Sequence, residues 1–254
     1  MALGTASGGR RLNLRGCFDF RDVGGYPAAG GASTRWRALY RSDGLCDLTG
    51  AGRRELGELG VASVIDLRSG AELAAQGPGP VPGTTFYLPL PAVLPGLPDG
   101  AGSAEPELIA ESYYTTLLSG VETMREIFAI LTDRASYPAV VCCPTGIDRT
   151  GIVIAAVLGA IGVPEDVLVR DFAASREATI RRTGRMRFEH PALVQPQVDR
   201  FGPGLLGVVP EALEGCLTLL REDFGTLAGY AESIDMAGAL PYIAAALLEP
   251  RPHR

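Results

Sequence analysis

The sequence predicts an α/β fold in which a central, mostly parallel sheet is flanked by helices. Apolar segments of strand length alternate with segments of helical periodicity, and this alternation is typical of parallel sheets covered on both faces. The clearest unit is 138–161, where an apolar strand, a tight loop and an apolar helix follow one another. A chain of 254 residues that is 46% hydrophobic can bury one large core. We expect a single domain over 14–250, with extra helices at its C-terminal end, preceded by a disordered segment, 1–13.

Hydrophobic periodicity and turn residues define the elements of the N-terminal half. An extended segment, 18–26, leads into a loop of small residues, 27–34. Ser69 and Glu72 have the spacing of a capping box, which predicts the start of a short helix. In chain order, the expected elements are a strand at 36–40, a helix at 49–59, a strand at 61–67, a helix from 69 to 77 and a strand at 84–90.

The C-terminal half is predicted to be mainly helical. The stretch 89–106 is rich in Pro, Gly and Ala, and a loop of this length is usually a lid, a binding loop or a disordered segment. The segment 176–187 holds five arginines; a solvated helical face is the favoured interpretation, and contact with a phosphate-rich substrate or an acidic partner is the alternative. The expected helices are 106–118, 121–134, 151–163, 164–172, 210–224 and 237–248.

The loop after the strand at 139–143 carries the most specific chemistry. Cys143 lies between a strand end and a helix start, where the helix dipole favours a thiolate, so it is a candidate nucleophile. Arg149 follows six residues later and can bind two phosphate oxygens through its planar guanidinium. The intervening amides can form a ring of donors, Gly146 permits the bend, and the Thr150 hydroxyl can steady the sulfur. The candidate phosphate-binding residues are Cys143, Pro144, Thr145, Gly146, Ile147, Asp148 and Arg149.

A Cys-x5-Arg spacing is weak by itself, because the chain has five cysteines and 23 basic residues. The alternative interpretation is a buried cysteine that packs as a small hydrophobe. The context is more specific than the spacing, since a strand precedes the loop, a glycine lies within it and an apolar helix follows. Together these features favour an anion-binding loop with a thiolate inside it.

The loop Cys142-Cys143-Pro144-Thr145-Gly146-Ile147-Asp148-Arg149-Thr150-Gly151 resembles that of the cysteine-dependent tyrosine phosphatases, in their bacterial branch of tyrosine and phosphoinositide phosphatases. The segments 20–26, 39–43, 64–69 and 224–230 resemble other landmarks of this branch, in the same order. The resemblance implies a tyrosine phosphatase fold and a hydrolase that needs no cofactor or metal. It also implies that Asp148 is the favoured general acid and that 89–106 is a lid beside the active site.

Two residues of the loop depart from the family pattern. The family histidine before the nucleophile is Cys142 here, and the family lysine is Ile147. A pocket for a multiply phosphorylated inositol would need that lysine charge, so the sequence favours phosphotyrosine or a small phosphomonoester instead. Cys142 either fills a small buried site, which is the favoured interpretation, or forms a redox link with Cys143.

Four further residues are candidates for the site. Asp66, at a neighbouring strand end, is the alternative general acid, and its other interpretation is an orienting partner of Arg68 or of the loop. Arg41 and Asp43 follow a strand, where α/β sheets bind ligands, although a structural ion pair explains them equally well. Tyr113 belongs either to a substrate-contacting lid or to a helix core.

Composition excludes several classes of function. A formal net charge of −6 argues against nucleic-acid binding. Five cysteines without metal-like spacing and only two histidines predict no metal site and a reducing compartment. Without a signal peptide or a membrane-spanning segment in the sequence, we expect a cytoplasmic location.

The sequence therefore predicts a metal-independent phosphomonoester hydrolase that acts through a cysteinyl-phosphate intermediate on a phosphorylated substrate. The alternative is a phosphatase of a small metabolite, such as a nucleotide or a sugar phosphate. A sulfurtransferase or arsenate reductase and a phosphate-binding module without turnover are less favoured, because Cys143, Asp148 and Arg149 occur together in the expected context.

Overall fold

The central sheet has five strands in the order β1-β4-β7-β5-β6. The structure is a computed structural model, and it describes residues 9–79, 81, 83–91, 105–189 and 208–251. Strands β4, β7, β5 and β6 run parallel, and β1 is antiparallel to β4 at one edge, which confirms the predicted fold class. The strands are β1 (Arg21–Asp22), β4 (Leu39–Ser42), β5 (Ser63–Asp66), β6 (Thr84–Tyr87) and β7 (Ala139–Cys142).

The register of the sheet brings three strand ends together. Cys142 pairs with Ser42 of β4 on one side and with Asp66 of β5 on the other. The residues that follow, Asp43, Leu67 and Cys143, therefore leave the sheet at one edge. This is the carboxyl edge, where parallel α/β sheets bind their ligands.

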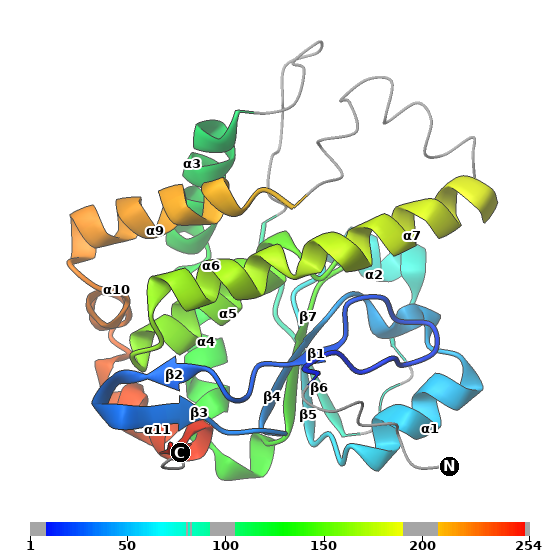
Figure 1. Cartoon of the computed structure of the whole chain (residues 1–254), viewed down its shortest axis with the longest axis horizontal. Coiled ribbons are helices and arrows are strands. Elements are labelled where there is room, and N and C mark those ends of the chain that lie inside the picture. Colours follow the sequence, from blue (N-terminus) through cyan, green and yellow to red (C-terminus); the bar gives the residue numbers. More distant parts are fainter. Residues whose placement is uncertain (1–8, 80, 82, 92–104, 190–207, 252–254) are drawn as a thin grey trace.

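Both faces of the sheet are covered by helices (Figure 1). Val140 and Cys142 belong to a core cluster with Leu56 of α1, whereas Val141 and Cys143 belong to a second cluster with the helices of the other face. The alternation follows from the two-residue period of a strand. The helices are α1 (Gly50–Glu58), α2 (Gly70–Gln76), α3 (Pro106–Ser119), α4 (Val121–Thr132), α5 (Asp148–Ala160), α6 (Glu165–Ala173), α7 (Ser175–Glu189), α9 (Pro210–Phe224), α10 (Leu227–Ser233) and α11 (Leu240–Leu247).

Local signals define several of these helices. Thr49 caps α1 by accepting a hydrogen bond from the Gly52 amide. Ser69 and Glu72 form the predicted capping box at α2, with both reciprocal hydrogen bonds present. α5 is apolar around nearly its whole circumference and is buried between the sheet and the outer helices, as its composition predicts.

A second, small sheet contradicts the predicted loop at 27–34. Its strands β2 (Pro27–Ala28), β3 (Ala32–Thr34) and β8 (Leu248–Pro250) are too short to give a period-two pattern in the sequence. Gly30 and Gly31 have positive φ angles and turn the chain between β2 and β3. β8 pairs with β3, so the chain becomes extended where the helix expected at 237–248 ends.

The strand expected at 36–40 begins only at Leu39. Arg37 has a left-handed φ of 59°, which no strand residue adopts, and its amide donates to the Asp22 carboxylate at 2.8 Å. The expected disordered segment lies outside the described residues over 1–8, while the backbone amide of Leu12 donates to the Phe20 carbonyl. Most of the expected lid, 92–104, also lies outside the described residues.

Candidate active site

The loop between β7 and α5 curves around the end of the sheet. Gly146 has a φ of 73°, and a Cβ at this position would lie 2.6 Å from the Asp43 amide nitrogen. Only glycine therefore allows the loop to pass so close to the end of β4. The α5 helix begins at Asp148, so Arg149 and Thr150 occupy its first turn and the loop amides precede its N-terminus. Helix N-termini of this kind attract anions.

Cys143 and Thr150 are both buried at this helix start. The Cys143 side chain is 1% exposed, and it leaves the sheet on the face that carries α5. The Thr150 hydroxyl is fully buried and has no hydrogen-bond partner within the described part of the chain. A buried hydroxyl without a partner is costly unless it serves another group. Its predicted role in steadying the Cys143 sulfur stays a prediction.

Glu72 holds the Arg149 guanidinium in place. Arg149 Nη1 donates to Glu72 Oε2 at 2.8 Å and Nη2 donates to Oε1 at 2.6 Å, while Nη1 also donates to the Leu67 carbonyl at 3.1 Å. The hydrogen bonds from Arg149 lower the pKa of Glu72 to about 2. A two-point contact of this kind fixes the plane of the guanidinium.

The sequence predicted Glu72 as a helix cap and missed its contact with Arg149. The same carboxylate also accepts the Ser69 amide at 2.7 Å, which is the hydrogen bond of the capping box. The cap at the start of α2 therefore orients the arginine of a loop 77 positions later in the chain. The sequence offered one signal for this role, which is the acidic residue in the first turn of α2, the helix that follows β5.

The Asp148 carboxyl receives a hydrogen bond from α3. The Tyr113 hydroxyl donates to Asp148 Oδ1 at 2.5 Å. Burial raises the pKa of Asp148, and the hydrogen bond from Tyr113 opposes this rise. The carboxyl can therefore hold a proton at higher pH than an exposed aspartate, as a general acid must. The Tyr113 ring is 1% exposed, so it lies in the core and its hydroxyl reaches the site.

Replacing Tyr113 by phenylalanine is expected to shift the pH profile. Loss of the hydrogen bond removes an interaction that favours the ionised carboxylate, so the pKa of Asp148 rises further. The basic limb of kcat/KM should move to higher pH, and the plateau should fall about three- to tenfold because the carboxyl is no longer oriented. Tyr114→Phe, which alters a hydroxyl bonded to Asp223 instead, is the matched control. A basic limb that stays in place in Tyr113→Phe would contradict the coupling.

Arg41 and Asp43 bind protein groups at the base of the loop. Arg41 Nη2 donates to the Gly146 carbonyl at 2.7 Å, and Nη1 donates to Asp171 Oδ2 at 2.6 Å. The Asp43 carboxylate accepts the backbone amides of Phe18 and Asp19 at 3.0 Å each. Both side chains are almost fully buried, so their geometry favours structural roles over the predicted substrate contacts.

Asp66 also binds a protein group, because it forms an ion pair with Arg68. Arg68 donates from Nε to both Asp66 oxygens at 3.0 Å and from Nη2 to Oδ2 at 2.7 Å. Both oxygens of Asp66 are therefore occupied by the Arg68 guanidinium. This geometry favours Asp148 over Asp66 as the general acid.

Cys142 and Cys143 face opposite sides of β7. Cys142 packs in the cluster that contains Tyr40 and Leu45, and burial raises the pKa of its thiol well above the usual value. A low thiolate content and the opposite orientation of its neighbour both disfavour a bond between the two sulfurs. The geometry supports the favoured interpretation, in which Cys142 fills a buried space.

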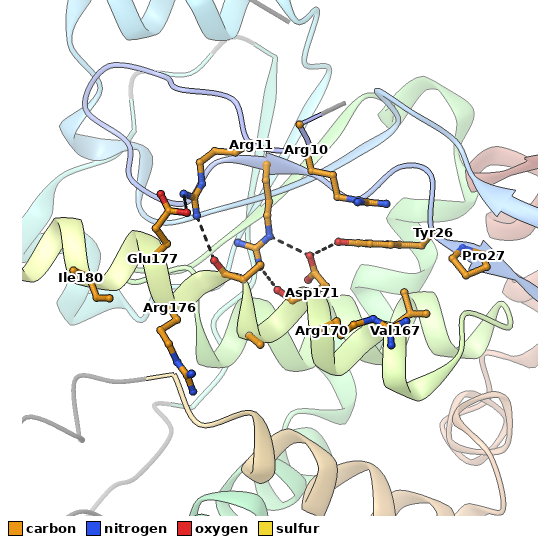
Figure 2. Close-up of a pocket in the computed structure, with 14 residues that line it drawn as sticks. Arg10, Arg11, Tyr26, Pro27, Val167, Arg170, Asp171, Arg176, Glu177 and Ile180 are labelled. Carbon is orange, nitrogen blue, oxygen red and sulfur yellow. Dashed lines mark hydrogen bonds and ion pairs between the residues drawn. The ribbon is translucent and has the colours of Figure 1, made fainter. Parts of the chain in front are cut away.

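A cavity of about 940 Å³ lies outside the loop, between the N-terminal segment and the α6–α7 junction (Figure 2). At its base the Tyr26 hydroxyl donates to Asp171 Oδ1 at 2.8 Å, and Arg21 Nε donates to the same oxygen at 3.1 Å. Arg10 and Arg176 point away from one another in this view, so they do not form one anion site. The base of this cavity is instead the ion network that anchors Arg41.

Neither a metal-binding cluster nor a membrane-spanning helix occurs in the described part of the chain. No group of three or more His, Cys, Asp or Glu side chains there is arranged to hold a metal ion. Within the same residues, no helix has the length and apolar character needed to cross a bilayer.

The chain is similar to known phosphatases over most of its length. A model of the tyrosine phosphatase family matches residues 12–240. The chain is 30% identical to the triple specificity protein phosphatase PtpB of Mycobacterium tuberculosis, over 89% of this chain and 94% of that protein. It is 26% identical to a putative tyrosine-protein phosphatase of Cupriavidus necator, over 85% of this chain and 82% of that protein. A tyrosine-protein phosphatase of Nostoc commune is also 26% identical, over 79% and 70%. This chain belongs to the tyrosine phosphatase family.

Proposed function

We propose that Cys143, Asp148 and Arg149 are the catalytic residues of this tyrosine-phosphatase-like hydrolase, and that its substrate is phosphotyrosine or a small phosphomonoester. The observation that supports the assignment most strongly is the arrangement of the loop. A buried cysteine precedes a helix start, an arginine is fixed there by Glu72, and an aspartate with a raised pKa occupies the first helical position. These are the nucleophile, the anion-binding group and the proton donor that phosphate transfer requires.

In the first step, the Cys143 thiolate attacks phosphorus in line with the ester bond. The sulfur–phosphorus bond forms as the phosphorus–oxygen ester bond breaks, and Asp148 gives its proton to the leaving oxygen. The loop amides and Arg149 stabilise negative charge on the three equatorial oxygens. Glu72 holds the plane of the Arg149 guanidinium in one orientation. The arginine therefore does not have to be reoriented toward the phosphate oxygens during the reaction.

In the second step, water attacks the cysteinyl-phosphate. Asp148, now ionised, accepts a proton from the water as its oxygen bonds to phosphorus. The sulfur–phosphorus bond breaks, inorganic phosphate leaves, and both the thiolate and the protonated Asp148 are restored. Each proton and electron pair is accounted for by protein groups and water, so we expect turnover in the presence of a chelator.

Ile147 supports the choice of substrate class. It occupies the middle of the loop, is 5% exposed and belongs to the hydrophobic core. A neutral residue here offers no charge to the additional phosphates of a phosphoinositide. The five free thiols of the chain suit a reducing compartment, and we propose a cytoplasmic location on that ground.

A panel of phosphomonoesters tests the proposed function. Phosphate release is measured with phosphotyrosine peptides, phosphoinositides, nucleotides and sugar phosphates, in the presence of a chelator. We expect a phosphotyrosine peptide to give the highest kcat/KM and phosphoinositides to be poor substrates. A small metabolite in first place would instead support a metabolic phosphatase. Thiosulfate or arsenate turnover without phosphate release would contradict the proposal.

A further inference from the structure

Arg182 reaches the phosphate loop from a distant part of the chain. It lies in α7, and its Nη1 donates to the Pro144 carbonyl at 3.2 Å. Pro144 directly follows Cys143, so the guanidinium is held beside the first residue of the loop. The side chain is partly buried, so part of it remains accessible.

Arg182 has no ion-pair partner among the described residues. Its hydrogen bond is to the neutral carbonyl of Pro144. Arg149, by contrast, is paired with Glu72 through both of its terminal nitrogens. The positive charge of Arg182 also opposes the effect of burial on the pKa of Asp148, so its field extends into the site.

Two other arginines near the loop form ion pairs with aspartates. Arg41 is paired with Asp171 behind the loop, and Arg68 is paired with Asp66. Ile147 brings no charge from within the loop. Among the described arginines that contact the loop or its neighbouring strand end, Arg182 is thus the one without a carboxylate partner.

We propose that Arg182 is an anion-binding residue at the rim of the loop, and that the site prefers phosphomonoesters carrying a second negative group beside the ester phosphate. This inference rests on the proposed function. A charge-assisted hydrogen bond to the second group offsets the cost of bringing another anion to an acidic protein. The second group can be a carboxylate next to phosphotyrosine in a peptide or one further phosphate on a small molecule, because both present the same chemistry to a guanidinium. One guanidinium serves one such group, so the several phosphates of a multiply phosphorylated inositol stay unmatched.

The test uses two matched pairs of substrates. One pair is a phosphotyrosine peptide with an adjacent aspartate and the same peptide with asparagine, and the other is a sugar bisphosphate and its monophosphate. We expect the full chain to favour the doubly anionic member of at least one pair about tenfold in kcat/KM at low salt. The peptide pair and the sugar pair separate the two sources of the second charge.

Arg182→Gln is expected to remove this preference, and Arg182→Lys is expected to retain most of it because the charge remains. Arg181→Gln is the matched control: Arg181 is the adjacent residue of α7, its Nη2 donates to the Phe18 carbonyl at 2.8 Å, and the preference should be unchanged. In Arg182→Gln, kcat/KM should fall more for the doubly anionic member of each preferred pair than for its singly anionic partner, which a purely structural role would not produce.

The outcomes separate this inference from the proposed function. If Arg182→Gln lowers kcat/KM equally for both members of each pair, the arginine only supports the loop and the inference is overturned. If the parent shows no preference in either pair, the inference also fails, although phosphate release still supports the proposed function. If the parent releases no phosphate from any of the four substrates, the proposed function itself fails.

Discussion

Replacing Cys143 by serine is expected to lower kcat/KM by at least about 10⁴-fold. A serine hydroxyl stays protonated at neutral pH and is a much poorer nucleophile than a cysteine sulfur. The exchange of sulfur for oxygen in a buried space should leave the fold intact. Steady-state phosphate release, with circular dichroism to verify folding, measures the effect.

Cys142→Ser is the matched control for this substitution. Cys142 is adjacent in sequence and equally buried, but it faces the opposite side of β7. Its replacement should cost some stability and leave kcat/KM within about threefold of the parent, because the residue touches no reacting atom. Equal loss of activity in the two variants would show that the effect comes from packing at the strand end and would contradict a nucleophilic role for Cys143.

Replacing Arg149 by lysine is expected to lower kcat/KM by about 10³-fold. Lysine keeps the charge but lacks the planar fork that binds two phosphate oxygens, and it cannot repeat the two-point contact with Glu72. Because the lost contacts stabilise the transferring phosphate, kcat should fall along with kcat/KM. Arg125→Lys, at a surface ion pair with Glu122 and Asp235, is the control and should be nearly neutral.

Glu72→Gln tests how much the position of the Arg149 guanidinium contributes to activity, because the substitution leaves the arginine and its charge in the chain. The amide keeps the shape of the carboxylate but has only one oxygen to accept from the guanidinium, so the arginine loses one fixed contact. We expect a loss in kcat/KM of about 10- to 100-fold, smaller than that of Arg149→Lys. A loss in Glu72→Gln as large as in Arg149→Lys would contradict a positioning role and would place Glu72 among the reacting groups.

The sequence predicted those parts of the site that depend on neighbouring residues. The strand, loop and helix at 138–161 are local, and apolar periodicity with Gly146 is enough to define them. The capping box at Ser69 was found for the same reason. That Glu72 then binds Arg149 depends on β5 lying beside β7 in the sheet. No pattern within either segment of the sequence specifies that β5 pairs with β7.

The same limit explains the other differences. Arg41, Asp43 and Asp66 lie at or next to the carboxyl ends of β4 and β5, where ligands bind, and the sequence could not show that buried partners already occupy each of them. Tyr113 was assigned equally to the core and to the site, and it proves to have its ring in the core and its hydroxyl on Asp148. The short strands β2, β3 and β8 form by pairing between distant segments, which leaves too few residues for a periodic signal.

The central claim is that phosphate passes through a covalent bond to Cys143. The most direct measurement is rapid quenching of the Asp148→Asn variant after mixing with an activated aryl phosphate, followed by mass spectrometry of its peptides. Such a leaving group needs no proton, so the first step proceeds while hydrolysis of the intermediate is slowed. We predict close to one phosphoryl group per chain, attached to Cys143, and none in Cys143→Ser. A phosphoryl group on another residue, or turnover without any adduct in a variant that still releases phosphate, would contradict the mechanism.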